Sequence, residues 1–437
     1  MEPDGSRYWI PAASTGSAVR EGSGGTATLP AEVWTVSPKR TYVHVGLPKT
    51  GTTYIQSALW ENRSRLQAAG CLVPGDKRAA SWRAVSDLLG RRPHGAEARH
   101  VMGAWASLSE ALQNWDGERA VFSEELLSTA TKRHAQRLVA SLSPSEVHVV
   151  LTVRDLARTI PSVWQQEVRK GKTWTWDEFV STVRDPDSGP PTIGVAFWLR
   201  FDVERTLRIW EGVVPSAHIH VVVVPPRDAP PNVLIQRFAT AVGLDESLLA
   251  SPTPEGNTSL GVAETEALRR LNIRLANALN ERQYARAVVQ SVIPALQSRP
   301  TITRSQVPAE HRDWVKEKSH ELITFLRSSP YEIVGDLREL FLVTESGGGT
   351  DASKVAEADL VEPMTEALAA VCTAYGHFWW RSRRRDEALE SGSTTRLVSR
   401  ARTVSYRAKM ALLERSDRNE TLAKVARTYL RLSASRR

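Results

Sequence analysis

The stretch HVGLPKTGTTYIQ, His44 to Gln56, decides the fold class of this chain. It follows a short β-rich run, Thr41–Val45, and leads into a segment whose apolar residues recur at helical spacing as far as Gly70. A strand that passes through a glycine-containing loop into a helix offers unpaired backbone N–H groups and the positive end of a helix dipole to an anion. The stretch therefore predicts a phosphate-binding turn.

Further strands and helices are predicted on the C-terminal side of this turn. Apolar runs predict strands at Cys71–Val73, Arg119–Ser123, Val147–Val153 and His218–Val224. The last two are rich in Val and nearly continuous, which is typical of strands buried on both faces of a parallel sheet. Helical patterns cover Thr131–Leu142, Asp155–Lys170, Asp177–Val183, Gly194–Glu211, Leu260–Asn280, Ala309–Arg327 and Lys354–Tyr375, the last interrupted at Pro363.

This alternation predicts an α/β fold with an open, mainly parallel sheet flanked by helices, as in P-loop NTPases. We expect a disordered leader at 1–38, rich in Gly, Ser, Ala and Thr, and an α/β domain with a helical late part at 39–344. The segment ESGGGTDAS, 345–353, reads as a linker, and 354–437 as a helical, basic C-terminal extension.

The net charge of +8 is concentrated in that extension. Residues 381–437 hold 16 Lys or Arg and 6 Asp or Glu, which leaves 41 basic and 43 acidic residues in the first 380 positions. A basic helix with one apolar face is predicted in the tail at Leu422, Val425, Ala426, Tyr429 and Leu430. We expect this helix to contact its own domain, with an acidic partner or a membrane surface as alternatives, and we do not expect nucleic acid.

Composition and cysteine usage indicate a soluble globular protein. The chain is 437 residues long and 41% apolar, without the roughly 18 consecutive apolar residues of a membrane span. Its N-terminus lacks the apolar run of a secretory signal. Its two cysteines, Cys71 and Cys372, form neither a disulfide framework nor a metal-binding pair, so a cytoplasmic location is expected.

The position of the lysine distinguishes the loop from a nucleotide P-loop. A Walker A motif places its lysine directly after the second glycine, whereas Lys49 lies two residues before Gly51. The pattern G-x-P-K-x-G-T-T resembles the 5′-phosphosulfate loop of sulfotransferases that use 3′-phosphoadenosine-5′-phosphosulfate (PAPS). The resemblance implies a donor site that contains Pro48, Lys49, Thr50, Gly51, Thr52 and Thr53. It also implies that Tyr54 packs on the adenine, with a core aromatic as the alternative.

A second segment is similar to the 3′-phosphate motif of the same family. In VVLTVRDLARTIPSVWQQ, Arg154 ends the Val-rich strand and Ser162 follows eight residues later. A guanidinium suits phosphate because its planar fork donates two parallel charge-assisted hydrogen bonds. The chain lacks the later Arg-Lys-Gly segment with which many relatives close this site. Asn257 or Ser259 is the expected substitute.

The resemblance implies an in-line sulfuryl transfer in which positioning and charge stabilisation do most of the work. Lys49 would stabilise charge on the oxygen that bridges sulfate and the 5′-phosphate. The general base follows the strand Arg119–Ser123, and we expect Glu124, with Glu125 as the alternative. His44 and His148 are expected to be packed within strands, while His94 and His100 stay open as candidates. No metal is expected.

The sequence therefore predicts a PAPS-dependent sulfotransferase that acts on a hydroxyl or amine of a glycan or small molecule. It does not identify the acceptor. Two other classes remain as alternatives: a non-catalytic module that binds a phosphonucleotide or nucleic acid, and an atypical P-loop kinase.

Overall fold

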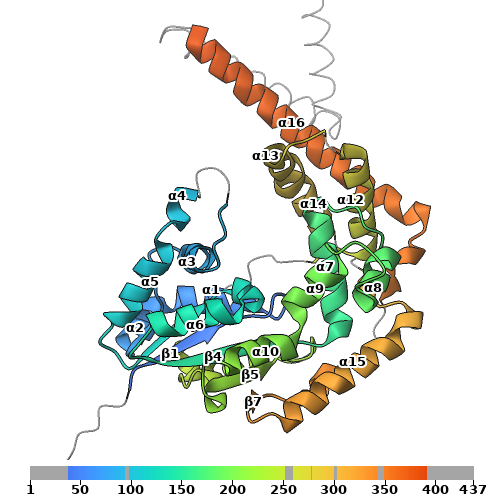
Figure 1. The fold of residues 1–437 in the computed structure, drawn as a ribbon. Coiled ribbons are helices and arrows are strands. Elements are labelled where there is room, and N and C mark those ends of the chain that lie inside the picture. Colours follow the sequence, from blue (N-terminus) through green and yellow to red (C-terminus); the bar gives the residue numbers. More distant parts are fainter. Residues whose placement is uncertain are drawn as a thin grey trace, which may run out of the picture. The chain divides into compact units, whose positions relative to one another are not determined.

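The computed structural model describes residues 38–93, 98–250, 259–276, 278–299, 303–341 and 349–390. Its centre is a six-stranded, all-parallel sheet in the order β2-β3-β1-β4-β5-β7 (Figure 1). The strands are β1 Arg40–His44, β2 Cys71–Leu72, β3 Arg119–Ser123, β4 Glu146–Val153, β5 Ile219–Val223 and β7 Glu332–Val334. The α/β fold with an open parallel sheet is thus confirmed.

Apolar side chains fill both faces of the sheet, which explains the near-continuous Val runs of β4 and β5. Because successive residues point to opposite faces, Val149 and Val150 belong to different cores. The Val149 face packs against α3 Ala80–Leu88, α5 Ala104–Gln113, α6 Lys132–Ser141, α10 Val203–Glu211 and α15 Ala309–Ser328. The Val150 face packs against α1 Thr52–Glu61, α2 Arg63–Ala68 and α11 Val233–Ala241.

A third core lies mainly among helices that pack against one another. It contains Trp164, Trp176 and Phe197. Its helices are α7 Leu156–Arg169, α8 Trp176–Arg184, α9 Gly194–Phe201, α12 Val262–Leu275, α14 Ile293–Gln297 and the π-helix η5 Ala285–Val292. The short helices α4 Ala98–Val101 and α13 Glu281–Tyr284 complete the α-helices that precede the long α16, Val361–Glu390.

Two sequence expectations about helix ends are wrong. Gly194–Glu211 forms two helices because the Asp202 side chain accepts a hydrogen bond from the Arg205 N–H, at 2.9 Å, and caps α10. Pro363 does not interrupt its helix. Because α16 begins at Val361, the proline lies in the first turn, where a missing N–H breaks no helical hydrogen bond.

The expected linker and tail are only partly within the described residues. Of 345–353, the described part forms β8, Thr350–Asp351, and the start of a 3₁₀ turn. β8 pairs in parallel with β6, Ser305–Gln306. The leader and the basic helix expected near Leu422 lie outside the described residues. None of the described helices combines the length and hydropathy needed to cross a membrane.

Candidate active site

The carboxyl ends of three neighbouring strands bring the predicted site residues together. β1 lies between β3 and β4. The strands β2 and β3 lie on one side of β1, and the later strands β4, β5 and β7 lie on the other, so the order of the strands reverses next to β1. Open α/β sheets bind ligands at such a switch point. The phosphate loop follows β1, Glu124 and Glu125 follow β3, and Arg154 follows β4. The Glu124 N–H donates to the His44 carbonyl at 3.0 Å, which fastens the end of β3 to the start of the loop.

The backbone of the phosphate loop requires glycine at two positions. Gly46 and Gly51 have φ values of 95° and 86°. A Cβ at Gly51 would collide with Leu234. Lys49 also has a positive φ, 65°, which is uncommon for a residue with a side chain and is found where surrounding contacts enforce it. α1 begins at Thr52, and Gly51 at its N-cap has no side chain that could cap the helix.

The threonines of the loop have different surroundings. Thr50 is buried, and its hydroxyl is hydrogen bonded to the Thr152 hydroxyl. The Thr52 hydroxyl donates to a carboxylate oxygen of Glu125. Thr53 is exposed, and Pro48 is half-buried. Thr50 therefore holds the loop from inside, whereas Thr52 links the loop to Glu125, the second residue after β3.

Lys49 lies among other cations. Burial, together with the positive charges of Arg169, Lys170 and Arg154, lowers the pKa of Lys49 to about 8, against the opposing effect of Glu125. Such mutual repulsion is relieved when an anion binds between the cations. The arrangement therefore favours a multiply charged anion beside Lys49.

Arg154 connects the second motif to the first. Its Nη1 donates to the Lys49 carbonyl at 3.0 Å. Its Nε is buried and has no hydrogen-bond partner among the described residues. Burial lowers the pKa of Arg154 to about 10, and the charges of Arg158, Arg227 and Arg304 contribute. A buried N–H without an acceptor is costly, so this group is suited to an incoming anionic oxygen.

Ser162 lies on α7 beyond Arg154, and its hydroxyl donates to the Arg158 carbonyl at 2.8 Å. The bond lies within one helix, so the hydroxyl proton of Ser162 already has an acceptor. Ser162 is half-buried. It can offer its hydroxyl to a ligand only by releasing this helical acceptor.

Two arginines whose charges act on Arg154, Arg227 and Arg304, were not predicted from the sequence. Burial lowers the pKa of Arg227, and the charges of Arg304 and Arg158 act in the same direction. Arg227 stands in the loop after β5, a strand end where a ligand residue is expected. Arg304 directly precedes the two-residue strand β6 and has no sequence signal.

The expected substitutes for the late segment were Asn257 and Ser259. Asn257 lies outside the described residues. Ser259 is exposed shortly before α12. Among the described residues, Arg227 and Arg304 contribute positive charge near Arg154, and the expectation for Asn257 stays a prediction.

The two glutamates after β3 differ in environment. Glu124 is 6% exposed, and its Oε1 accepts a hydrogen bond from the Leu126 N–H at 3.2 Å. Burial raises the pKa of Glu124 to about 7, the Leu126 bond opposes this, and the neighbouring Glu125 adds to it. A carboxylate that titrates near 7 is well matched to general-base catalysis at neutral pH. Glu125 is held by Thr52 instead.

The aromatic residue after the loop, Tyr54, packs at the edge of the core that contains α1 and α11. Its hydroxyl donates to the Pro231 carbonyl at 3.2 Å. The half-buried ring thus closes the space between α1 and the loop before α11.

The histidines considered as bases lie in dissimilar places. His44 is fully buried, with Nδ1 2.7 Å from the Ser123 hydroxyl and Nε2 3.1 Å from the Thr152 hydroxyl. Burial lowers the pKa of His44 to about 3. His100 is exposed on α4, and His94 lies outside the described residues. His44 is therefore a packed and hydrogen-bonded core residue.

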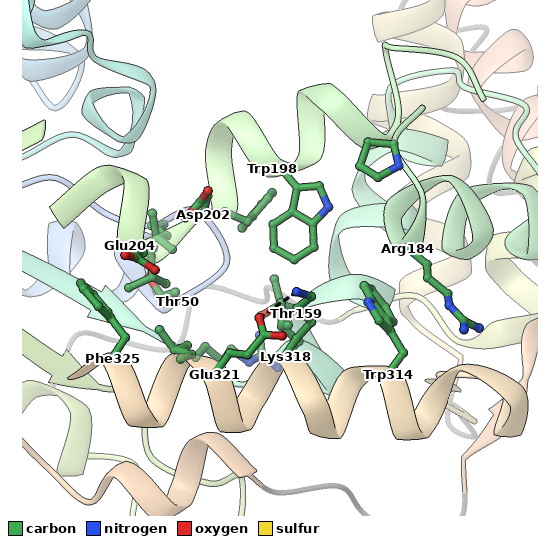
Figure 2. Close-up of a pocket in the computed structure, with 17 residues that line it drawn as sticks. Thr50, Thr159, Arg184, Trp198, Asp202, Glu204, Trp314, Lys318, Glu321 and Phe325 are labelled. Carbon is green, nitrogen blue, oxygen red and sulfur yellow. Dashed lines mark hydrogen bonds and ion pairs between the residues drawn. The ribbon is translucent and has the colours of Figure 1, made fainter. Parts of the chain in front are cut away.

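Two cavities adjoin the phosphate loop. The larger, about 410 Å³, lies between the start of α7, α9 and α15. Trp198, Trp314 and the ion pair of Lys318 and Glu321 line it (Figure 2). Arg154 and the loop residue Thr50 also line it, whereas Lys49, Glu124 and Glu125 do not.

The smaller cavity, about 280 Å³, is the one next to the candidate base. Glu124 and Glu125 line it together with Thr53. Trp60 and Trp82 supply apolar walls. The carboxylate of Glu124 and the start of α1 therefore face the same cavity.

Comparisons with known proteins do not show a family for this chain. No family model matches the chain, and no curated protein sequence matches it. Among solved structures, the chain is similar to the crystal structure of a sulfotransferase from Alicyclobacillus acidocaldarius. The TM-score is 0.33 and the sequence identity 13%, over 55% of this chain and 96% of that chain. The assignment of the site rests on the geometry described above.

Proposed function

We propose that this chain is a sulfotransferase that moves a sulfuryl group from PAPS to a hydroxyl or amine of an acceptor. One observation carries the proposal. The lysine of the phosphate loop and the arginine after β4 come from motifs 105 residues apart, and the arginine donates to the backbone of that lysine. Two groups suited to anions, from separate sequence motifs, therefore lie next to each other.

The residues present fit the two charged ends of PAPS. The uncapped start of α1 and Lys49 would hold the 5′-phosphosulfate. Arg154, whose buried Nε has no hydrogen-bond partner in the described part of the chain, would hold the 3′-phosphate. Arg227 and Arg304 would close that side in place of the missing late segment. PAPS, when bound, supplies an activated sulfuryl group with a phosphate leaving group.

Lys49 would stabilise the charge that develops on the oxygen between sulfur and phosphorus. Its ammonium group lies in a partly desolvated position, where electrostatic stabilisation is stronger than in water. The nearby Glu125 opposes deprotonation of Lys49. Glu125 thus helps to keep the lysine charged while its own position is fixed by Thr52.

Glu124 would accept the proton of the acceptor. It lines the smaller cavity, which we assign to the acceptor because its carboxylate and the first residues of α1 meet there. Glu125 lines the same cavity and is the alternative base. The tryptophan walls favour an acceptor with an apolar or sugar face beside the reacting hydroxyl or amine.

Transfer can be tested directly. Purified protein is incubated with sulfur-labelled PAPS and a metabolite extract, and products are analysed by mass spectrometry for the gain of one sulfuryl group. Wild type is expected to label an acceptor, and Lys49→Met to lower the rate by about 10²–10³-fold, as when one stabilising donor is removed. Lys132→Ala, an exposed lysine on α6, is the matched control. Equal labelling by wild type and Lys49→Met would overturn the assignment.

A further inference from the structure

A second cluster of polar side chains lies at the opposite, amino edge of the sheet. Glu146 begins β4, His148 follows it on the same face, and His218 directly precedes β5. Because β4 and β5 pair Val149 with Ile219, His148 and His218 are side by side. Their rings stack with centroids 4.2 Å apart. One ligand-type atom from each of the three residues lies within 4.8 Å of the others.

A chain of hydrogen bonds fixes the tautomer of His148. The His220 Nδ1 lies 2.5 Å from a carboxylate oxygen of Glu332, which can only accept, so His220 donates from Nδ1. The Nε2 of a neutral His220 must then accept. It lies 2.9 Å from the His148 Nδ1, so His148 donates from Nδ1 and carries a free lone pair on Nε2.

Burial favours the uncharged form of both rings, because it lowers the pKa of His148 and of His220, and the hydrogen bond to Glu332 opposes this effect at His220.

Among the described residues, no contact offsets the cost of burying the Nε2 nitrogen of His148. His148 is 8% exposed, and its Nε2 is buried without a hydrogen-bond partner among the described residues. The nearest carboxylate oxygen, from Glu146, is 3.9 Å away. A nitrogen lone pair and a carboxylate facing each other repel, unless a cation lies between them. Arg40 forms an ion pair with the same carboxylate oxygen at 3.6 Å, from a side chain that is itself about half exposed.

We infer that Glu146, His148 and His218 form a binding site for a divalent transition-metal ion, with Zn²⁺ as the best match. Two imidazole nitrogens and one carboxylate are a donor set that suits Zn²⁺, whereas Mg²⁺ and Ca²⁺ prefer oxygen ligands throughout. His220 and Glu332 act behind the ligands, since a metal-bound imidazole commonly donates its other N–H into such a chain.

The site is independent of the sulfuryl-transfer chemistry. It lies at the amino ends of β4 and β5, whereas the phosphate loop and Arg154 lie at the carboxyl ends of β1 and β4. A metal held there joins β4 to β5 directly, and joins β7 through Glu332. Its expected effect is to stabilise the fold.

Metal binding is tested on untagged, full-length protein that has been treated with a chelator and then dialysed. We expect isothermal titration calorimetry to show about one tightly bound Zn²⁺, and thermal denaturation to show a higher Tm with Zn²⁺ than with Mg²⁺. His218→Ala and Glu146→Gln, both at partly exposed positions, should lower Zn²⁺ affinity by more than about 10–100-fold. Glu332→Gln should lower it by about 10–100-fold without removing a ligand.

His377→Ala, an exposed histidine on α16, is the matched control and should bind Zn²⁺ as wild type does. The proposal is overturned if wild type binds no Zn²⁺. It is also overturned if both His218→Ala and Glu146→Gln bind Zn²⁺ as tightly as wild type, because the ion would then lie elsewhere. None of these outcomes depends on nucleotide binding or sulfuryl transfer.

Discussion

The guanidinium of Arg154 donates a hydrogen bond to the backbone carbonyl of Lys49 at 3.0 Å. Lys49 is also the loop residue whose φ, 65°, lies in the left-handed region. Arg154 therefore does two things: it helps to hold the loop in an uncommon conformation, and it keeps its buried Nε available for an anion.

Replacement of Arg154 should weaken nucleotide binding more than it weakens the fold. Arg154→Ala removes charge-assisted bonds worth about 1.5–3 kcal/mol each, so adenosine 3′,5′-bisphosphate should bind at least 10-fold more weakly. Arg154→Lys keeps the charge but loses the fork and should restore only part of the affinity. Calorimetric titration measures both, with exposed Arg133→Ala as the control. Unchanged affinity in Arg154→Ala would remove this residue from the site.

Arg304 should distinguish nucleotides by their 3′-phosphate. Because Arg304 and Arg227 add positive charge near Arg154, Arg304→Ala should weaken adenosine 3′,5′-bisphosphate by roughly 10-fold. Binding of adenosine 5′-phosphosulfate, which lacks the 3′-phosphate, should change little. A competition assay with both nucleotides gives the comparison. An equal loss for the two would place Arg304 at the 5′ side or assign it a general structural role.

The pH profile of kcat/KM should be bell-shaped. The rising limb follows deprotonation of Glu124, whose pKa is raised to about 7, and the falling limb follows deprotonation of Lys49, whose pKa is lowered to about 8. Glu124→Gln should abolish the rising limb and most of the activity. If Glu125→Gln does this and Glu124→Gln does not, Glu125 is the base. Initial rates between pH 5 and pH 10, taken at low acceptor concentration, decide between them.

Burial of Glu124 should also make stability depend on pH. Its pKa is 4.5 in a free chain and about 7 in the folded protein. Below pH 4.5 both states hold the proton, and between these values only the unfolded chain releases it, so stability falls as pH rises through this window. Glu124→Gln stays neutral throughout and should gain on the order of 2–3 kcal/mol over wild type at pH 8, relative to pH 4.5. Denaturant unfolding at both pH values measures the difference, and the same difference at both would contradict the raised pKa.

The strands and the positions of the phosphate loop and Arg154 at strand ends could be predicted, because each depends on a short continuous stretch of sequence. β3 occupies Arg119–Ser123 as the apolar run predicts, and β4 differs from its predicted run by a single residue. The phosphate loop and the segment around Arg154 are each one continuous motif that directly follows a strand. By contrast, β7 has only three residues, Glu332–Val334, which is too short for a periodic signal.

The remainder of the site depends on residues that the fold brings together. Arg304 follows Arg154 by 150 positions and has no motif around it, so only the three-dimensional structure reveals their shared charge field. The burial that sets the pKa of Glu124 is likewise a tertiary property. Arg227 could have been predicted from the sequence, because it lies shortly after a strand with a clear apolar pattern.

Calorimetric titration with adenosine 3′,5′-bisphosphate, without added divalent metal, tests the central claim most directly. The uncapped start of α1, Lys49 and Arg154 predict saturable binding of one bisphosphate per chain, and predict much weaker binding of ATP with Mg²⁺. Tight binding of ATP with Mg²⁺, together with no detectable binding of the bisphosphate, would contradict the proposed function.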